Sequence, residues 1–166
     1  GTIEITTNSN YKVNAQNIVD FGSSNYFFAP KSSNAIIFDF KDRRVQLSHY
    51  SLQSSNNFYM MNWFLETSDD LKQWTVIDKK INCTDLIAPR SSSTYSVHHH
   101  VFSRYVRYRH EGPSLSDGYE TDVGLAIQNI EFYGQLRDSQ TTSTHFVWST
   151  NNDWATGTFA DLFGSA

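Results

Sequence analysis

The chain has 166 residues, which is enough for one domain with a substantial hydrophobic core. Its formal net charge is −4, and this mild acidic balance argues against binding to nucleic acid or to an anionic membrane. Aromatic residues make up 15% of the chain and charged residues only 18%. Together with abundant serine, threonine and asparagine, this composition predicts many strands, polar loops and little helix.

Cys83 is the single cysteine, so the chain cannot form an internal disulfide. A reducing compartment is the simpler interpretation of a lone thiol, and we therefore expect an intracellular, cytoplasmic protein. Secretion stays open as an alternative, because a secreted domain of this size can fold without a disulfide.

Eight segments have the alternation or the residue types of strands. In chain order they are residues 2–6, 35–40, 45–52, 63–67, 74–78, 94–98, 104–110 and 126–133. In the second of them Ile36, Phe38 and Phe40 share one face, and Asp39 lies on the other. Short strands at intervals of about ten residues, without amphipathic helices between them, predict a sandwich or a barrel.

The strand pattern stops after Gly134, and we place a domain boundary near Arg137. Residues 1–137 are predicted to form one β-domain. Residues 138–166 are predicted to be a polar linker followed by an aromatic tail.

Several motifs, taken in order, resemble the discoidin family (factor V/VIII type C domains). They are residues 33–40, ending in Asp39-Phe40; the tryptophan hairpin of 63–70 and 73–76; and the strands 104–108 and 130–134, with 20–27 at the place of the first ligand loop. The resemblance covers about residues 2–136 and implies an all-β, antiparallel jelly-roll β-sandwich of the galactose-binding type. Trp63 and Trp74, on the two arms of the hairpin, are expected to pack in its core.

The chain departs from the family pattern in three ways. Leu71 stands where a glycine is usual, so we expect a different hairpin turn, and Phe27 replaces the more usual tryptophan. The terminal disulfide of the family is absent, which favours its intracellular branch.

No catalytic motif is evident in the sequence. It contains no Gly-x-Ser-x-Gly elbow, phosphate loop, dinucleotide fingerprint or HExxH pattern, so we expect a protein that is not an enzyme. Successive residues of a strand point to opposite faces, so His98, His99 and His100 cannot all face one zinc ion, and we expect an exposed strand end instead.

The resemblance implies one possible cofactor, a structural calcium ion between the first loop and the last strand. Carried over by position, its oxygen ligands are Asp20, the carbonyl groups of Val19 and Ser23, Asn25 and Glu131. Glu131 has the alternative role of a hydrogen-bonding partner for neighbouring backbone.

The resemblance also implies that loops at one end of the sandwich form the recognition surface. Aromatic and methionine side chains beside polar groups predict the ligand-binding loop residues Phe27, Phe28, Phe58, Tyr59, Met60, Arg90 and Tyr119. Arg107 and Arg109 share one face of their strand, where they either clamp an anionic ligand or pair with neighbouring acids.

The tail carries large apolar side chains that are unlike the preceding linker. We interpret it as a partner-docking segment or a self-association segment, with Trp148, Trp154, Phe159, Leu162 and Phe163 as its anchors.

These features favour a non-enzymatic module that recognises a protein or peptide inside a larger intracellular assembly. A carbohydrate-binding module of the galactose type and a purely structural domain of a polymer or axoneme are the two alternatives.

Overall fold

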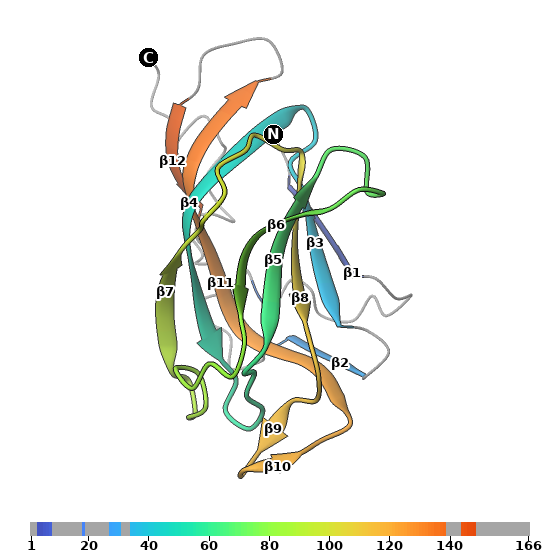
Figure 1. The fold of residues 1–166 in the computed structure, drawn as a ribbon, viewed down its shortest axis with the longest axis vertical. Coiled ribbons are helices and arrows are strands. Elements are labelled where there is room, and N and C mark those ends of the chain that lie inside the picture. Colours follow the sequence, from blue (N-terminus) through green and yellow to red (C-terminus); the bar gives the residue numbers. More distant parts are fainter. Residues whose placement is uncertain (1–2, 8–17, 19–26, 31–33, 139–143, 149–166) are drawn as a thin grey trace.

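The computed structural model describes residues 3–7, 18, 27–30, 34–138 and 144–148. These residues form two antiparallel sheets that face each other (Figure 1). The β8 sheet contains, in spatial order, β1 (Glu4–Thr7), β3 (Ala35–Asp39), β8 (Tyr105–His110), β5 (Trp63–Ser68) and β6 (Thr75–Lys80). The β11 sheet contains β12 (Thr144–Trp148), β11 (Val123–Asp138), β4 (Arg43–Ser54) and β7 (Ser92–Ser96), and β2 (Phe27–Pro30) also pairs with β11. The structure thus confirms the predicted all-β sandwich.

A small hairpin of β9 (Leu115–Ser116) and β10 (Tyr119–Glu120) projects from one end of the sandwich (Figure 1). The other extra strand, β12, pairs with residues 132–136 of β11, so the β11 sheet continues beyond the boundary predicted near Arg137. β2, β9, β10 and β12 are absent from the predicted strands. No described helix is long and apolar enough to cross a membrane.

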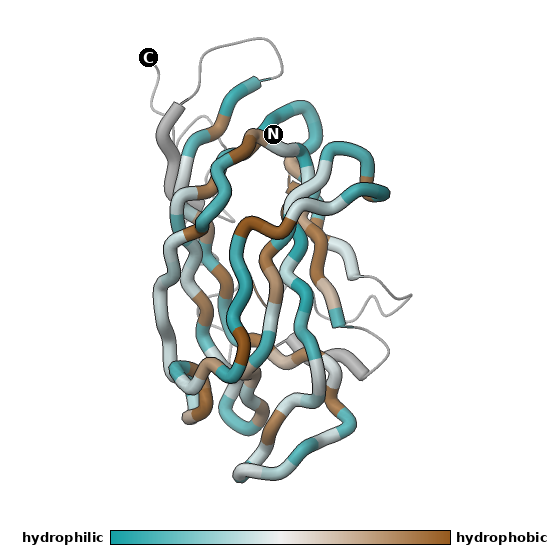
Figure 2. The backbone as a smooth tube through the Cα atoms, in the orientation of Figure 1, coloured by the Kyte–Doolittle hydropathy of each residue, from teal (hydrophilic) through white to brown (hydrophobic). Residues whose placement is uncertain are grey.

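The core lies between the inner faces of the two sheets, because hydrophobic and hydrophilic residues alternate along the strands (Figure 2). Phe38 of β3 packs edge-on against Phe132 of β11 across the interior, with ring centroids 5.0 Å apart. Trp63 is fully buried, contacts the ring of Tyr95 and donates a 2.9 Å hydrogen bond from its Nε1 to the Tyr50 hydroxyl. The predicted core position of Trp63 is therefore correct.

The prediction for Trp74 is wrong. Its ring is half-buried on the outer face of the β8 sheet, where the Arg107 guanidinium lies 3.9 Å from the ring centroid. The Trp74 Nε1 donates to the Leu71 carbonyl at 3.2 Å, which holds the indole against the hairpin rather than in the core. The cation–π contact with Arg107 stabilises the Trp74 ring on the surface, so the ring does not need to be buried between the sheets.

Leu71 adopts the left-handed conformation that a glycine at this position would take, with φ of 63°. The turn is held by Ser68 and Asp70, whose side chains accept backbone N–H bonds from residues 70–73. The expected difference from the family's hairpin turn stays a prediction.

Candidate functional site: the loop end of the sandwich

Three connections meet at the end of the sandwich that carries β9 and β10, and we call this surface the loop end. They are residues 55–62 between β4 and β5, 81–91 between β6 and β7, and 111–122 between β8 and β11. Loops of this kind form a recognition surface only if the fold holds them in place.

Backbone hydrogen bonds tie the three connections to one another. Tyr59 and Leu115 exchange two of them, at 2.8 and 2.9 Å, and the Arg90 N–H donates to the Ser55 carbonyl at 3.2 Å. The Cys83 N–H donates to the Met61 carbonyl at 2.9 Å. Because these bonds join residues far apart in sequence, the loop end is largely preorganised.

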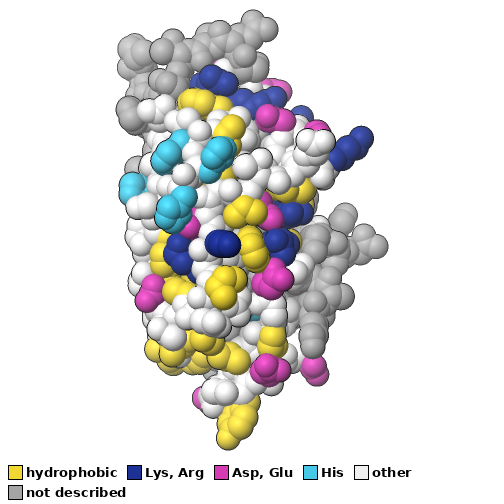
Figure 3. Space-filling view, viewed as in Figure 1, with side chains coloured by type: hydrophobic (Ala, Val, Ile, Leu, Met, Phe, Trp, Pro, Cys, Tyr) yellow, Lys and Arg dark blue, Asp and Glu magenta, His cyan; other side chains and the backbone are white. Residues whose placement is uncertain are grey.

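The β9–β10 hairpin presents the most exposed aromatic residue of this end. Asp117 and Gly118 have φ of 49° and 82°, and two successive positive φ angles define a type I′ turn, which matches the twist of the flanking strands. Directly after this turn, Tyr119 leaves 78% of its surface exposed. Ile87, in the neighbouring connection, is 44% exposed, and hydrophobic side chains are visible at this end of the molecule (Figure 3).

The charge of the loop end is acidic. Within these three described connections Arg90 is the one basic residue, and it is exposed. The acidic residues of the same connections are all exposed and are Asp85, Glu111, Asp117, Glu120 and Asp122, of which Glu111 forms an ion pair with Arg109 of β8 at 2.9 Å. The potential of the surface therefore disfavours anionic ligands.

The structure separates the predicted loop residues into two groups. Tyr119 and Arg90 are exposed at the loop end, and Phe58 is half-buried there. Met60 is fully buried beneath the Tyr108 hydroxyl, and the Tyr59 residue is only 8% exposed. The prediction of Met60 and Tyr59 as surface residues is wrong because their loop folds back and closes the end of the core.

Phe27 and Phe28 do not lie in a loop, contrary to the prediction. Their backbone forms β2, which pairs with residues 126 and 127 of β11. The sequence does not indicate this pairing, because β2 is only four residues long and has no alternation of its own.

Arg107 and Arg109 lie on the outer face of the β8 sheet, where they share a buried carboxylate. The Arg107 Nε donates to Glu66 at 2.6 Å and the Arg109 guanidinium donates to it at 3.0 Å. Burial raises the pKa of Glu66, but the hydrogen bonds from Arg109 and Arg107 outweigh it, so the pKa lies below its ordinary value. The arginines thus pair with an acid, and the predicted role as a ligand clamp at the loops is not supported.

The histidine segment is exposed, as predicted. The His98 Nδ1 lies 2.8 Å from the buried Asp78 carboxylate, which also accepts hydrogen bonds from Tyr50 and Lys80 at 2.6 Å each. Histidine side chains gather on the face seen in Figure 3. Among the described residues, however, no group of three or more histidine, cysteine or acidic side chains is arranged to hold a metal ion.

The predicted calcium site falls mostly outside the described residues. Val19, Asp20, Ser23 and Asn25 are not described, so the site stays a prediction. Glu131 lies in β11, where its carboxylate accepts a 2.5 Å hydrogen bond from the Tyr133 hydroxyl. In the predicted tail, the backbone of Trp148 belongs to β12, whereas Trp154, Phe159, Leu162 and Phe163 lie outside the described residues.

Comparison with known proteins shows similarity in structure alone. No protein-family model matches the chain, and no curated protein matches its sequence. The module CpGH89CBM32-6 produced by Clostridium perfringens gives a TM-score of 0.54 at 17% identity, over 80% of this chain and 93% of the module. The chitosan-binding module 1 of a chitosanase/glucanase from Paenibacillus sp. IK-5 also gives 0.54, at 15% identity, over 80% of this chain and 93% of that module.

A family 89 glycoside hydrolase from Clostridium perfringens gives a TM-score of 0.59 at 16% identity, over 86% of this chain but only 15% of the hydrolase. These similar structures are mainly carbohydrate-binding modules, a non-catalytic kind of domain, although some belong to glycoside hydrolases. At this level of identity the likeness establishes the fold. The chain has the galactose-binding-like, or discoidin-like, β-sandwich fold that family 32 carbohydrate-binding modules share.

Proposed function

We propose that this protein is a non-catalytic carbohydrate-binding module whose loop end holds the sugar. The observation that carries the proposal is Tyr119, which is 78% exposed and directly follows a type I′ turn at the tip of a preformed surface. An exposed aromatic ring provides a flat apolar face for the C–H groups of a sugar, and its hydroxyl can hydrogen-bond. Because the turn holds the backbone that carries the ring, binding needs little further ordering of the loop itself.

The charge of the loop end narrows the class of sugar. The three connections carry five exposed carboxylates and one exposed arginine, and one of the carboxylates, Glu111, is paired with Arg109 of β8. Sugar acids would meet net repulsion there, whereas uncharged or amine-bearing sugars would not. Neutral and amino sugars are therefore the favoured ligands.

Two observations favour this function over recognition of a protein or peptide. The similar structures are mainly carbohydrate-binding modules. The arginines that an acidic peptide would use, Arg107 and Arg109, are paired with Glu66. The peptide hypothesis depends further on the aromatic tail, most of which lies outside the described residues.

A glycan array followed by calorimetry tests the proposal, with Tyr119→Ala as the decisive variant. We expect binding to neutral or amino sugars, weakened about tenfold or more by Tyr119→Ala, which corresponds to a loss of about 1.4 kcal/mol. Val76→Ala is the matched control, because Val76 is 43% exposed but lies on β6, outside the three connections. The proposal fails if no glycan binds, or if Tyr119→Ala binds as tightly as the wild type.

A further inference from the structure

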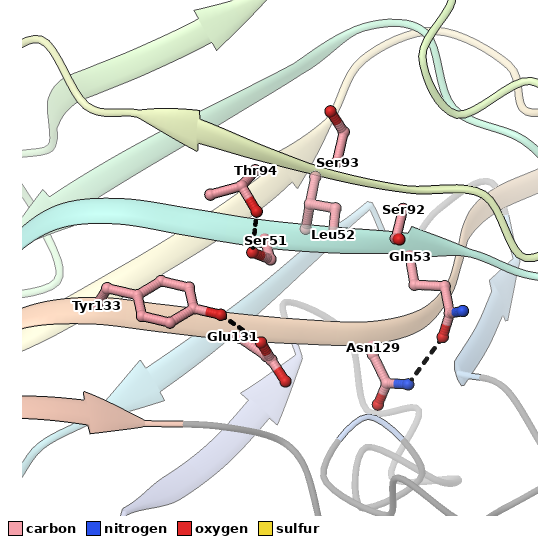
Figure 4. Close-up of a pocket in the computed structure, with 9 residues that line it drawn as sticks. All are labelled: Ser51, Leu52, Gln53, Ser92, Ser93, Thr94, Asn129, Glu131 and Tyr133. Carbon is pink, nitrogen blue, oxygen red and sulfur yellow. Dashed lines mark hydrogen bonds between the residues drawn. The ribbon is translucent and has the colours of Figure 1, made fainter.

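A hollow on the outer face of the β11 sheet has the size of a ligand site, and we call it the sheet groove (Figure 4). Its volume is about 510 Å³, within the range of small-molecule sites. It is lined by residues of β4, β7 and β11, namely Ser51, Leu52, Gln53, Ser92, Ser93, Thr94, Asn129, Glu131 and Tyr133.

The lining side chains are almost all neutral hydrogen-bonding groups. Ser51 and Thr94 join their hydroxyls at 2.6 Å, and the Asn129 amide donates to the Gln53 side chain at 3.0 Å (Figure 4). Asn129 is only 5% exposed, so this pair forms a fixed floor rather than a mobile surface. Hydroxyl and amide groups on a rigid sheet can donate to and accept from the hydroxyl groups of a saccharide.

The outer face of the β8 sheet has a very different composition. There Glu66 pairs with Arg107 and Arg109, and Asp39 with Arg104, so charged groups cover and neutralise one another. In contrast, the residues that the structure places around the sheet groove include one carboxylate and no lysine, arginine or histidine. A surface that only needed to be soluble would not require this concentration of neutral polar groups around one hollow.

Tyr133 and Glu131 give the groove an aromatic ring and an acceptor. The Tyr133 hydroxyl donates to the Glu131 carboxylate at 2.5 Å, and the ring extends along β11 (Figure 4). Burial and the bond to Glu131 raise the pKa of Tyr133, so the hydroxyl stays protonated at physiological pH. The pair therefore presents an apolar ring surface beside an anionic acceptor, which suits uncharged or amino sugars rather than acids.

The groove adjoins the loop end at Gln53, one of its lining residues. The Gln53 side chain donates to the Arg90 carbonyl at 3.1 Å, and the Ser54 N–H donates to the Ser91 carbonyl at 2.9 Å. From this junction the lining follows β11 from Asn129 to Tyr133, a rise of about 13 Å in an extended strand. That length exceeds one sugar ring.

We propose that the sheet groove is a second subsite for a neutral oligosaccharide, which runs from the loop end past Gln53 and along β11 to Tyr133. This inference rests on the proposed function, because it takes one end of the glycan to lie at Tyr119. The protein would then bind oligosaccharide chains rather than single terminal sugars, and its affinity should increase with the length of the oligosaccharide.

Isothermal calorimetry with ladders of two to six sugars tests this proposal on the full chain. The probes are N-acetylchito-, cello-, manno- and galacto-oligosaccharides. Ser92→Trp places a bulky side chain at an exposed position of the groove, and Ser96→Trp is its matched control. Ser96 is exposed on the same side of β7 by the period of two but does not line the groove.

We expect the wild type to bind the six-sugar probe of at least one ladder about tenfold tighter than the two-sugar probe. Ser92→Trp should abolish that gain and leave the affinity for the two-sugar probe within about twofold, whereas Ser96→Trp should keep the gain. The proposal is overturned if the wild type binds short and long probes equally, or if Ser92→Trp retains the gain. Absence of binding to every ladder by the wild type would instead contradict the proposed function itself.

Discussion

Replacing Glu66 with glutamine should destabilise the fold, because two arginines share this one buried carboxylate. The Glu66 side chain is 5% exposed, and Arg107 and Arg109 approach it at 2.6 and 3.0 Å. Each hydrogen bond to a charged group contributes about 1.5–3 kcal/mol, but both arginines are partly exposed and regain some hydration. We therefore expect the free energy of unfolding to fall by about 2–4 kcal/mol.

Urea denaturation followed by tryptophan fluorescence measures this loss. Glu111→Gln is the control, because Glu111 contacts the same Arg109 at 2.9 Å but is 53% exposed, so its loss should stay below about 1 kcal/mol. Equal losses for the two variants, or a loss below about 1 kcal/mol for Glu66→Gln, would refute the conclusion that the buried Glu66 carboxylate stabilises the β8 sheet through its two arginines.

The pH dependence of the free energy of unfolding, measured for the wild type and for Glu66→Gln, provides a second check. The ordinary pKa of a glutamate is 4.5, and that of folded Glu66 is lower. Between these two pKa values the unfolded chain holds a proton that the folded protein does not. The stabilisation by the carboxylate is thus complete above about pH 4.5 and is lost as the pH falls through the folded pKa. The stability difference between wild type and Glu66→Gln should shrink over that interval.

Three further predictions concern stability. Burial lowers the pKa of His110 below 6.5, so the free energy of unfolding should fall as the pH drops below that value, and His110→Asn should flatten this slope in urea titrations at pH 5 and 7.5. Leu71→Gly should raise stability by about 0.5–1 kcal/mol, because φ of 63° strains leucine and its side chain is 47% exposed; a loss of stability would contradict the strain argument. Gly134→Ala should cost on the order of 2 kcal/mol, because an added Cβ would lie 2.1 Å from the Gln46 carbonyl oxygen at the β11–β4 bulge; an unchanged melting temperature would contradict this close approach.

The strand pattern and the sandwich were predictable from the sequence because they depend on local alternation. Residues 35–40 show Ile36 and Phe38 on one face, and both side chains are fully buried. The Asp117-Gly118 dipeptide is a common type I′ turn and thus a usable signal for the β9–β10 hairpin, although the residue types predict a loop at Tyr119.

The remaining features depend on residues that are distant in sequence. Glu66 lies 41 residues before Arg107, and only the pairing of β5 with β8 brings them together. The same pairing supplies the cation that holds Trp74 on the outer face. The sheet groove requires three strands in register, so a single sequence pattern on β4, β7 or β11 could not reveal it.

An NMR titration of the uniformly labelled protein with a neutral hexasaccharide that it binds tests most directly the claim that the loop end recognises saccharides. Saccharide recognition at the loop end predicts the largest amide shift changes in residues 115–120, with further changes in the sheet groove at 51–53, 92–94 and 129–133. Changes confined to the outer face of the β8 sheet around Arg107, or spread evenly over the molecule, would contradict the account.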